Sequence, residues 1–231
     1  MNASPKFLNP LVEIEKHGAK LPHWQQDSAT YFVTFRLADS IPLSKLAPLR
    51  DARDAWLKLH PKPWADEKER EYHRIFTRQI ESWLDAGSGA CELRDPRAAK
   101  IAGDALNFFE GKRCRQYAWV VMPNHVHALF SLLNGHKLED LLHSWKSFSA
   151  NKINDALGRK GTLWQPDYHD RLIRTREHFN HCAEYIRKNP EHAKLHEGEF
   201  LIFVGPGLDG MEPGLPAPDN SAKSGQDAPA P

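Results

Sequence analysis

Residues 120–133, VVMPNHVHALFSLL, constrain the fold more than any other stretch of the chain. Pro123 and Asn124 suit the middle of a tight turn, so the apolar runs on either side predict two antiparallel strands, YAWVV and HVHALFSL. Alternate residues of a strand face the same side. His125 and His127 therefore point together, and two imidazoles inside an apolar strand need a reason.

Hydrophobic periodicity predicts the remaining elements. Alternating aromatic and β-branched residues in ATYFVTFRLADS predict a strand, and RLIRT predicts a shorter one. Apolar residues spaced by threes and fours predict helices, with capping and breaking residues at their ends. Helices are expected between Ser44, as an N-terminal cap, and Leu84. Another is expected after Asp95, and another before Gly158. The last is expected in REHFNHCAEYIRKN and should stop at Pro190.

The expected elements define the fold class. The helix that ends at Gly158 is expected to pack on the sheet through its apolar residues, Leu138, Leu141, Leu142, Trp145 and Phe148. Strands that alternate with helices and include a hairpin are typical of the α+β class. The sequence therefore predicts an antiparallel β-sheet with helices packed on it, mainly on one face.

Length and composition favour one principal domain. At 231 residues and 40% hydrophobic content the chain can bury one sizeable core, expected within residues 21–204. Residues 1–20 are weakly patterned and are expected to form an arm. Residues 205–231 are acidic, rich in Pro and Gly and poor in large apolar side chains, and they predict a disordered tail.

Cysteine use and hydropathy bear on the cellular compartment. The three cysteines are widely spaced and form no C-x-x-C pair, which argues against a disulfide framework and indicates a reducing cytoplasm. No apolar run approaches the roughly 20 residues that span a bilayer, and the N-terminus lacks the apolar core of a secretory signal. We therefore expect a cytoplasmic protein with no membrane partner.

Charge is unevenly distributed along the chain. Residues 111–194 hold 14 Lys and Arg against 8 Asp and Glu, a balance of +6, whereas residues 195–231 hold 1 against 6, a balance of −5. A basic block that contains the histidine pair permits nucleic-acid binding. Ordinary solvated charges on helix faces explain the same counts.

The last predicted helix carries polar residues on one face. His181, Tyr185 and Asn189 are spaced by four and share that face. Alone, such a face is more often a surface or a packing contact, and a lone H-x-H pair is more often structural than metal-binding. Both interpretations remain open on these residues alone.

Four motifs together resemble a known family, the single-tyrosine HUH transposases, and most closely the REP-associated tyrosine transposases of bacteria. They are YAWVVMPNHVHALF, with its histidine-hydrophobic-histidine signature, LLHSWKSFSANKIN, LWQPDYHDRLIR, and YIRKNP, which holds the family's nucleophilic tyrosine. The segment LPHWQQDSATYFVTFRLADS is similar to the family's first strand. The resemblance covers residues 21–195 and implies the antiparallel sheet with flanking helices that the family shares with RNA-recognition-like folds.

The resemblance implies a metal-dependent enzyme. Tyr185 would be the catalytic nucleophile, and His125, His127 and Asn189 would bind Mg²⁺ or Mn²⁺ through nitrogen and oxygen ligands. The implied reaction nicks and rejoins single-stranded DNA at REP-type hairpins through a 5′-phosphotyrosine intermediate. The implied partner is single-stranded or hairpin DNA, and the acting unit is a monomer or a homodimer.

Basic and aromatic side chains near such a site are candidates for DNA contacts. Each basic residue alone is more often a solvated charge, and Trp145 is assigned to the core. The resemblance and the basic block favour a DNA-binding role for Lys146, Lys152, Trp164, Arg171, Arg174 and Arg187.

Two other functions fit the same residues. A protein that binds REP hairpins without cutting them would bind DNA whether or not it has Tyr185. A metal-dependent phosphodiesterase would use His125 and His127 with water as the nucleophile and would form no covalent adduct. A purely structural interaction protein leaves the histidine pair unexplained.

Overall fold

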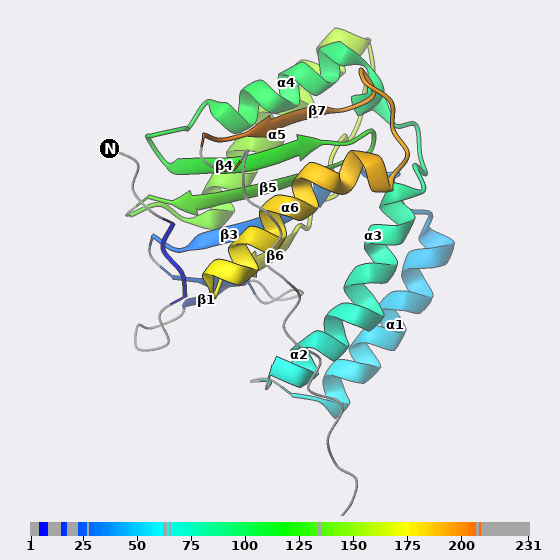
Figure 1. The fold of residues 1–231 in the computed structure, drawn as a ribbon. Coiled ribbons are helices and arrows are strands. Elements are labelled where there is room, and N and C mark those ends of the chain that lie inside the picture. The colour runs from blue at the N-terminus through cyan, green and yellow to red at the C-terminus, as the bar shows by residue number, and fades with distance from the viewer. Residues whose placement is uncertain are drawn as a thin grey trace, which may run out of the picture.

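A five-stranded antiparallel sheet forms the centre of the molecule, in the order β6-β3-β5-β4-β7 (Figure 1). The computed structural model describes residues 5–8, 15–17, 23–26, 28–61, 64, 66–133, 135–206 and 208. The five strands are β3 (Thr30–Arg36), β4 (Cys114–Val121), β5 (His125–Leu132), β6 (His169–Leu172) and β7 (Leu201–Val204). A separate two-stranded sheet pairs β1 (Glu15–His17) with β2 (His23–Gln25).

The predicted hairpin forms the middle of this sheet. β4 and β5 pair antiparallel, and the backbone N–H of Met122 donates to the carbonyl oxygen of His125 across the turn (2.8 Å). β3 covers the other edge of β5 and places Thr34 opposite His127. Every residue of β5 is buried, so both histidines lie inside the molecule.

Helices cover both faces of the sheet, which confirms the α+β class and corrects the expectation that they lie mainly on one face. α4 (Pro96–Asn107) and α5 (Leu138–Leu157) pack on one face, and α6 (Arg176–His192) packs on the other (Figure 1). The reason is in β5, where apolar residues alternate onto both faces. Each face therefore has surface that must be buried.

Two helix ends agree with the sequence, and the end of α6 differs from it. The Asp95 carboxylate accepts from the backbone N–H of Arg97 at the start of α4, and Gly158 ends α5 with a φ of +63°. α6, however, continues through Pro190 to His192. Proline removes only one hydrogen bond in this last turn, and the burial of its ring favours the helix.

Two side chains differ from their predicted roles. Ser44 lies inside α1 (Leu43–Leu59), whose cap position is Pro42 with no side-chain hydrogen bond. Phe148 is 49% exposed and lies outside the core that Trp145 joins. Periodicity alone does not fix the width of a buried stripe.

The predicted extra helices form a hairpin that projects from the sheet (Figure 1). α1 leads into α2 (Asp66–Tyr72), the π-helical turn η1 (His73–Thr77) and α3 (Arg78–Asp85). Trp56 of α1 packs against Tyr72 and Phe76, with ring centroids 5.5 and 6.0 Å apart. We call residues 43–85 the helical hairpin. The C-terminal end of α3 lies beside the C-terminal end of α6.

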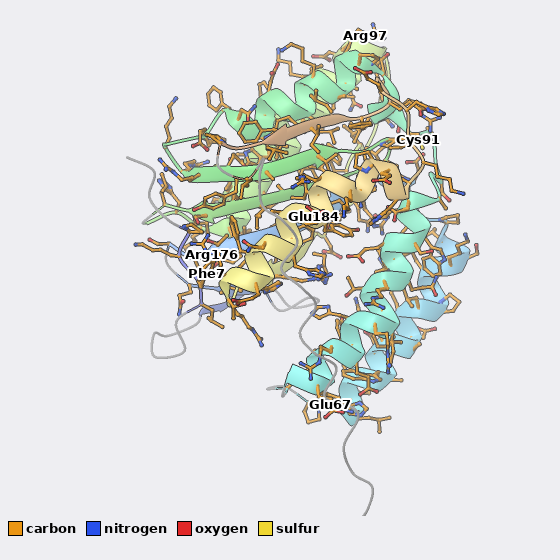
Figure 2. All side chains as sticks on the ribbon, viewed as in Figure 1. Phe7, Glu67, Cys91, Arg97, Arg176 and Glu184 are labelled. Carbon is orange, nitrogen blue, oxygen red and sulfur yellow. The ribbon has the colours of Figure 1, made fainter. Side chains whose placement is uncertain are left out.

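The chain ends contribute to the sheet side that carries α6. Phe7, in the predicted arm, lies under the guanidinium of Arg176 (5.2 Å) beside α6 (Figure 2). β7, which the motifs do not predict, pairs with β4. The predicted tail begins with ordered residues, since Gly205 donates to the carbonyl oxygen of Tyr117 and Leu208 is buried; residues 207 and 209–231 lie outside the described residues. Among the described residues, no helix is both long and apolar enough to cross a membrane.

Candidate active site

The two histidines of β5 approach each other through their Nε2 atoms. These atoms of His125 and His127 are 3.0 Å apart, and the side chains are 1% and 0% exposed. The Nδ2 of Asn124 donates to the carbonyl oxygens of Leu84 and Ser88, so its Oδ1 accepts from Nδ1 of His125 (2.8 Å). The Nε2 of His125 is therefore its unprotonated nitrogen.

Thr34 orients the second imidazole. Its Oγ1 lies 2.7 Å from Nδ1 of His127 across the β3–β5 pair. When Nδ1 of His127 donates to Thr34, the Nε2 lone pairs of both histidines are free for one cation. Adjacent donors of an octahedral ion, with bonds of about 2.1 Å, lie about 3 Å apart. The spacing of the histidine pair therefore fits a divalent cation.

Burial keeps both imidazoles neutral. It lowers the pKa of His125 to about 3. Burial, followed by the neighbouring charges of His125, Arg171 and His169, also lowers the pKa of His127 well below its usual value. Neutral imidazole is the form that binds metals. At neutral pH the pair is in that form.

α6 places Tyr185 against the second histidine. The Tyr185 ring centroid lies 5.2 Å from that of His127 and 5.8 Å from that of Phe32, with both pairs edge to face. The Tyr185 hydroxyl is buried and has no hydrogen-bond partner among the described residues. A phenol oxygen without a protein partner is available to a ligand.

The surroundings of Tyr185 favour its protonated form. Burial, and after it the negative charges of Glu81 and Asp85, raise the pKa of Tyr185 above its ordinary value. The positive charge of Arg171 acts in the opposite direction. Formation of a phenolate here therefore needs positive charge beyond what these residues supply.

Asn189 lies one helical turn beyond Tyr185 and is 0% exposed. Its amide is near enough to lower the Tyr185 pKa, yet neither Oδ1 nor Nδ2 meets hydrogen-bond geometry with any described residue. Leaving both polar atoms of a buried amide without hydrogen-bond partners lowers the stability of the folded protein. An amide oxygen is a ligand that Mg²⁺ and Mn²⁺ accept. Within the described part of the chain, no three His, Cys, Asp or Glu side chains form a cation site.

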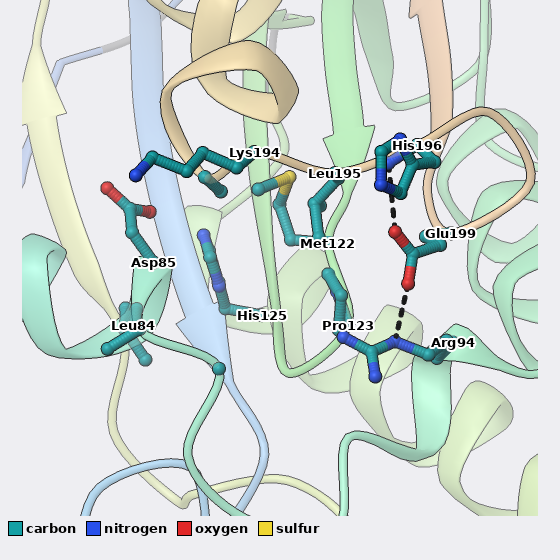
Figure 3. A pocket seen from close by; sticks show the side chains of 13 residues that line it. Leu84, Asp85, Arg94, Met122, Pro123, His125, Lys194, Leu195, His196 and Glu199 are labelled. Atoms are coloured by element: carbon teal, nitrogen blue, oxygen red, sulfur yellow. Dashed lines mark hydrogen bonds and ion pairs between the residues drawn. The ribbon is translucent and has the colours of Figure 1, made fainter.

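A cavity of about 340 Å³ opens beside His125, where the ends of α3 and α6 meet the start of β5 (Figure 3). The side chains of Asp85 and His125 both point into it. Burial, and then the charge of Glu81, raise the pKa of Asp85 to about 6, and its Oδ1 is buried with no hydrogen-bond partner. This carboxyl group is thus a polar wall of the histidine site.

Three of the predicted DNA-binding residues lie on the Tyr185 side of the sheet or beside it. Arg171 lines the same cavity as Tyr185, and its Nη2 lies 3.1 Å from Oε1 of Glu81. Arg187 follows two residues later on α6, paired with a neighbouring glutamate at 3.1 Å. Arg174 lies between β6 and α6 and is half-buried.

The other three lie on or against α5, on the opposite face of the sheet. Lys146 donates from Nζ to the carbonyl oxygen of Pro166 (2.5 Å), and Lys152 is exposed on α5. Trp164 is 4% exposed, with its ring centroid 4.9 Å from that of Phe35. The ring is therefore not exposed for contact with DNA in this structure. The structure does not bring these three residues to Tyr185.

The motifs do not predict the part that the helical hairpin plays here. Arg74, Arg78 and Glu81 line the cavity around Tyr185, and Asp85 lines the one beside His125. The sequence holds one signal for them, since Arg74 and Arg78, like Glu81 and Asp85, are four residues apart and share a helix face. This four-residue spacing does not indicate that the helix face lies near Tyr185, which is far along the chain.

Comparisons with known proteins agree with the motifs. Residues 98–189 match the family described as "Transposase IS200 like", a range that contains both histidines and ends at Asn189. The chain is 33% identical over 73 residues to the REP-associated tyrosine transposase of Escherichia coli (strain K12), a match that spans 32% of this chain and 42% of that protein. The chain thus matches less than half the length of this curated relative.

Two solved structures are also similar. One is a REP-associated tyrosine transposase bound to a REP hairpin, at 18% identity and a TM-score of 0.43, covering 76% of this chain and 74% of that one. The other is a putative transposase from Deinococcus radiodurans R1, at 14% identity and a TM-score of 0.30, covering 80% and 97%. Residues 98–189 are thus similar to the IS200-like transposases, and the resemblance to REP-associated tyrosine transposases that the motifs predict is confirmed.

Proposed function

We propose that this protein nicks and rejoins single-stranded DNA at or near REP-type hairpins, with Tyr185 as the nucleophile. The observation that carries the proposal is the placement of Tyr185, 5.2 Å between ring centroids from His127, in a buried site that also leaves Asn189 unpaired. The family match of residues 98–189 and the net charge of +6 in residues 111–194 support a DNA substrate.

His125, His127 and Asn189 would hold Mg²⁺ or Mn²⁺. When bound, the ion supplies positive charge that polarises the scissile phosphate. Asn124 and Thr34 keep the two imidazoles turned with Nε2 toward that position, because each holds an Nδ1 atom. Burial keeps water from competing with the phosphate for these residues.

Tyr185 performs the covalent step. Its oxygen forms a bond to phosphorus while the bond from phosphorus to the 3′ oxygen breaks, so the protein retains the 5′ phosphate and the other fragment leaves with a free 3′-OH. Arg171 favours loss of the phenol proton, because its charge lowers the pKa of Tyr185. Attack by a 3′-OH on the phosphotyrosine reverses the step and rejoins DNA.

One chain contains the whole arrangement. Tyr185 and His127 of the same protomer are in contact, so the site needs no residue from a second copy. This supports a monomer as the smallest acting unit. A homodimer could hold two such sites.

The direct test is formation of a covalent adduct. Hairpin DNA with a single-stranded flank is labelled at its 3′ end, incubated with Mg²⁺ or Mn²⁺, and run on a denaturing gel, because a 5′-phosphotyrosine retains the 3′ fragment. We expect a labelled protein band that disappears with EDTA, with Tyr185→Phe and with His125→Ala. DNA labelled at the 5′ end should give cleavage products and no labelled protein.

Matched controls separate chemistry from folding. Tyr117→Phe removes a hydroxyl on the same face of the sheet, where it bonds Ser131 at 3.0 Å, and His143→Ala removes an exposed imidazole of α5; both should keep the adduct. Cleavage without an adduct would indicate the water-using phosphodiesterase. Hairpin binding without cleavage would indicate the non-catalytic binder.

A further inference from the structure

A second, larger cavity lies between the helical hairpin and α6, with Tyr185 in its wall. Its volume is about 680 Å³, within the range of about 300–1,000 Å³ typical of sites for small ligands. The basic residues that line it come from three separate parts of the fold: Arg70, His73, Arg74 and Arg78 from the hairpin, Arg171 from β6, and His178 and His181 from α6. Several elements therefore turn basic groups toward one space.

The acidic residues of this cavity are mostly neutralised. The Glu71 carboxylate lies 2.6 Å from Nζ of Lys68, and the Glu81 carboxylate lies 3.1 Å from Arg171. Glu67 also lines the cavity, at the tip of the hairpin (Figure 2). The anionic charge nearest to the tyrosine is thus already paired within the protein.

Arg74 and Arg78 differ from the acidic residues. Both side chains are exposed, and neither forms a salt bridge or side-chain hydrogen bond with any described residue. Burial raises the pKa of Glu81, and the charge of Arg78 is among those that partly offset this. A guanidinium presents a planar set of donors that matches a phosphate. Two such groups, one helical turn apart, face a cavity that contains the proposed nucleophile.

A π-helical turn, η1, carries one of these two arginines. Such turns are rare and are frequently found at functional sites. η1 begins at His73, whose Nδ1 lies 3.0 Å from Oγ1 of Thr77 and whose ring packs edge to face with that of His169, the first residue of β6. This turn is where the hairpin meets the sheet, and Arg74 lies within it.

We propose that the helical hairpin is a single-stranded DNA-binding element, in which Arg74 and Arg78 hold the phosphates of the nucleotides that adjoin the scissile phosphate in the cavity beside Tyr185. The proposal rests on the proposed function, since it assigns the substrate contacts of the same site. The hairpin lies outside residues 98–189, which match the transposase family. The helical hairpin therefore lines the cavity beside Tyr185 with residues that the family match does not cover.

The test measures binding separately from cleavage. The Tyr185→Phe protein, which cannot form an adduct, is compared with the same protein carrying Arg74→Ala and Arg78→Ala. Fluorescence anisotropy gives Kd at several salt concentrations for two DNAs, a REP-type hairpin with a single-stranded flank and the same hairpin without it. Arg53→Ala with Lys58→Ala removes the same charge from α1, outside the cavity, and serves as the matched control.

We expect the double variant to lose affinity for the flanked hairpin only. Each phosphate contact on single-stranded DNA contributes about 0.7 to the slope of log K against log salt, so the slope should become shallower by about 1.4. The control variant should match the parent on both DNAs. Arg74→Lys with Arg78→Lys should keep most of the slope but bind more weakly, because lysine keeps the charge and loses the planar fork.

Two results would overturn the proposal. One is an unchanged Kd and slope for the flanked hairpin. The other is an equal loss on both DNAs, which would mean a general electrostatic effect. Circular dichroism shows whether each variant is folded. Arg74→Gln alone, at an exposed position, is a milder second variant for the case in which the double variant does not fold. If the wild-type protein forms no adduct, the proposed catalysis is refuted. The binding measurement still decides whether Arg74 and Arg78 hold the single-stranded flank, because it does not depend on cleavage.

Discussion

The two faces of β5 are equally buried and chemically different. Val126, Ala128 and Phe130 face α4 and α5 and are 0% exposed, whereas His125 and His127 face α6 and are 1% and 0% exposed. Burial alone therefore does not distinguish the face that packs from the face that carries the site. The nature of the buried groups does.

The difference lies in whether buried polar atoms are satisfied. On the α6 side, the Tyr185 hydroxyl, both amide atoms of Asn189 and Oδ1 of Asp85 lack partners among the described residues. The packing side has three such atoms, Nε1 of Trp145, Oε1 of Gln116 and Oε2 of Glu92, on three separate elements. Unpaired polar atoms cost stability, so their concentration around one tyrosine indicates a site that is completed by a ligand.

The largest expected effect tests the packing face. Phe130→Ala should lower the free energy of unfolding by about 3–5 kcal/mol, because it removes a fully buried ring and leaves a cavity. Urea unfolding followed by circular dichroism measures this. Mn²⁺ affinity of the folded protein should stay unchanged. A weaker affinity in the folded variant would show that the two faces are coupled.

The next effect tests the α6 face. Thr34→Ala should weaken Mn²⁺ binding about 10–100-fold, because it removes the group that orients His127, while the urea midpoint changes little. Isothermal titration calorimetry with Mn²⁺ alone measures the affinity. Thr34→Ser keeps the hydroxyl and should restore binding. If Thr34→Ala binds Mn²⁺ as tightly as the wild type, Thr34 has no orienting role.

The smallest effect is pH-dependent and concerns Asp85. Its pKa is raised from an ordinary value of 3.8 to about 6 in the folded protein. The folded state therefore binds this proton more tightly than the unfolded state, so its contribution to stability is present at low pH and is lost as pH rises through 6. Asp85→Asn should raise Tm by a few degrees at pH 8 and leave it unchanged near pH 4.

Differential scanning fluorimetry with EDTA present measures these Tm values. Asp104→Asn, an exposed change on α4, should show no difference between the two pH values. A larger Tm gain for Asp85→Asn at pH 4 than at pH 8 would contradict the raised pKa.

Local patterns predicted the elements that local forces dominate. Alternation and the Pro123–Asn124 turn predicted the β4–β5 hairpin, and capping residues predicted α4 and the end of α5, because these features depend on neighbours in sequence. The prediction that α6 stops at Pro190 is wrong, because burial of the proline ring favours continuation of the helix over the local preference of proline. β7 is four residues long and becomes a strand by pairing with β4.

The candidate site divides in the same way. The i, i+2 and i, i+4 spacings of the sequence placed His125 beside His127 and Tyr185 on one face with Asn189, since strand and helix geometry impose this. Tertiary packing decided that α6 faces the histidines, that Trp164 is buried, and that Arg74 of the hairpin lines the same cavity as Tyr185. These contacts join residues far apart in sequence, and their formation depends on which surfaces exclude water together rather than on any local repeat.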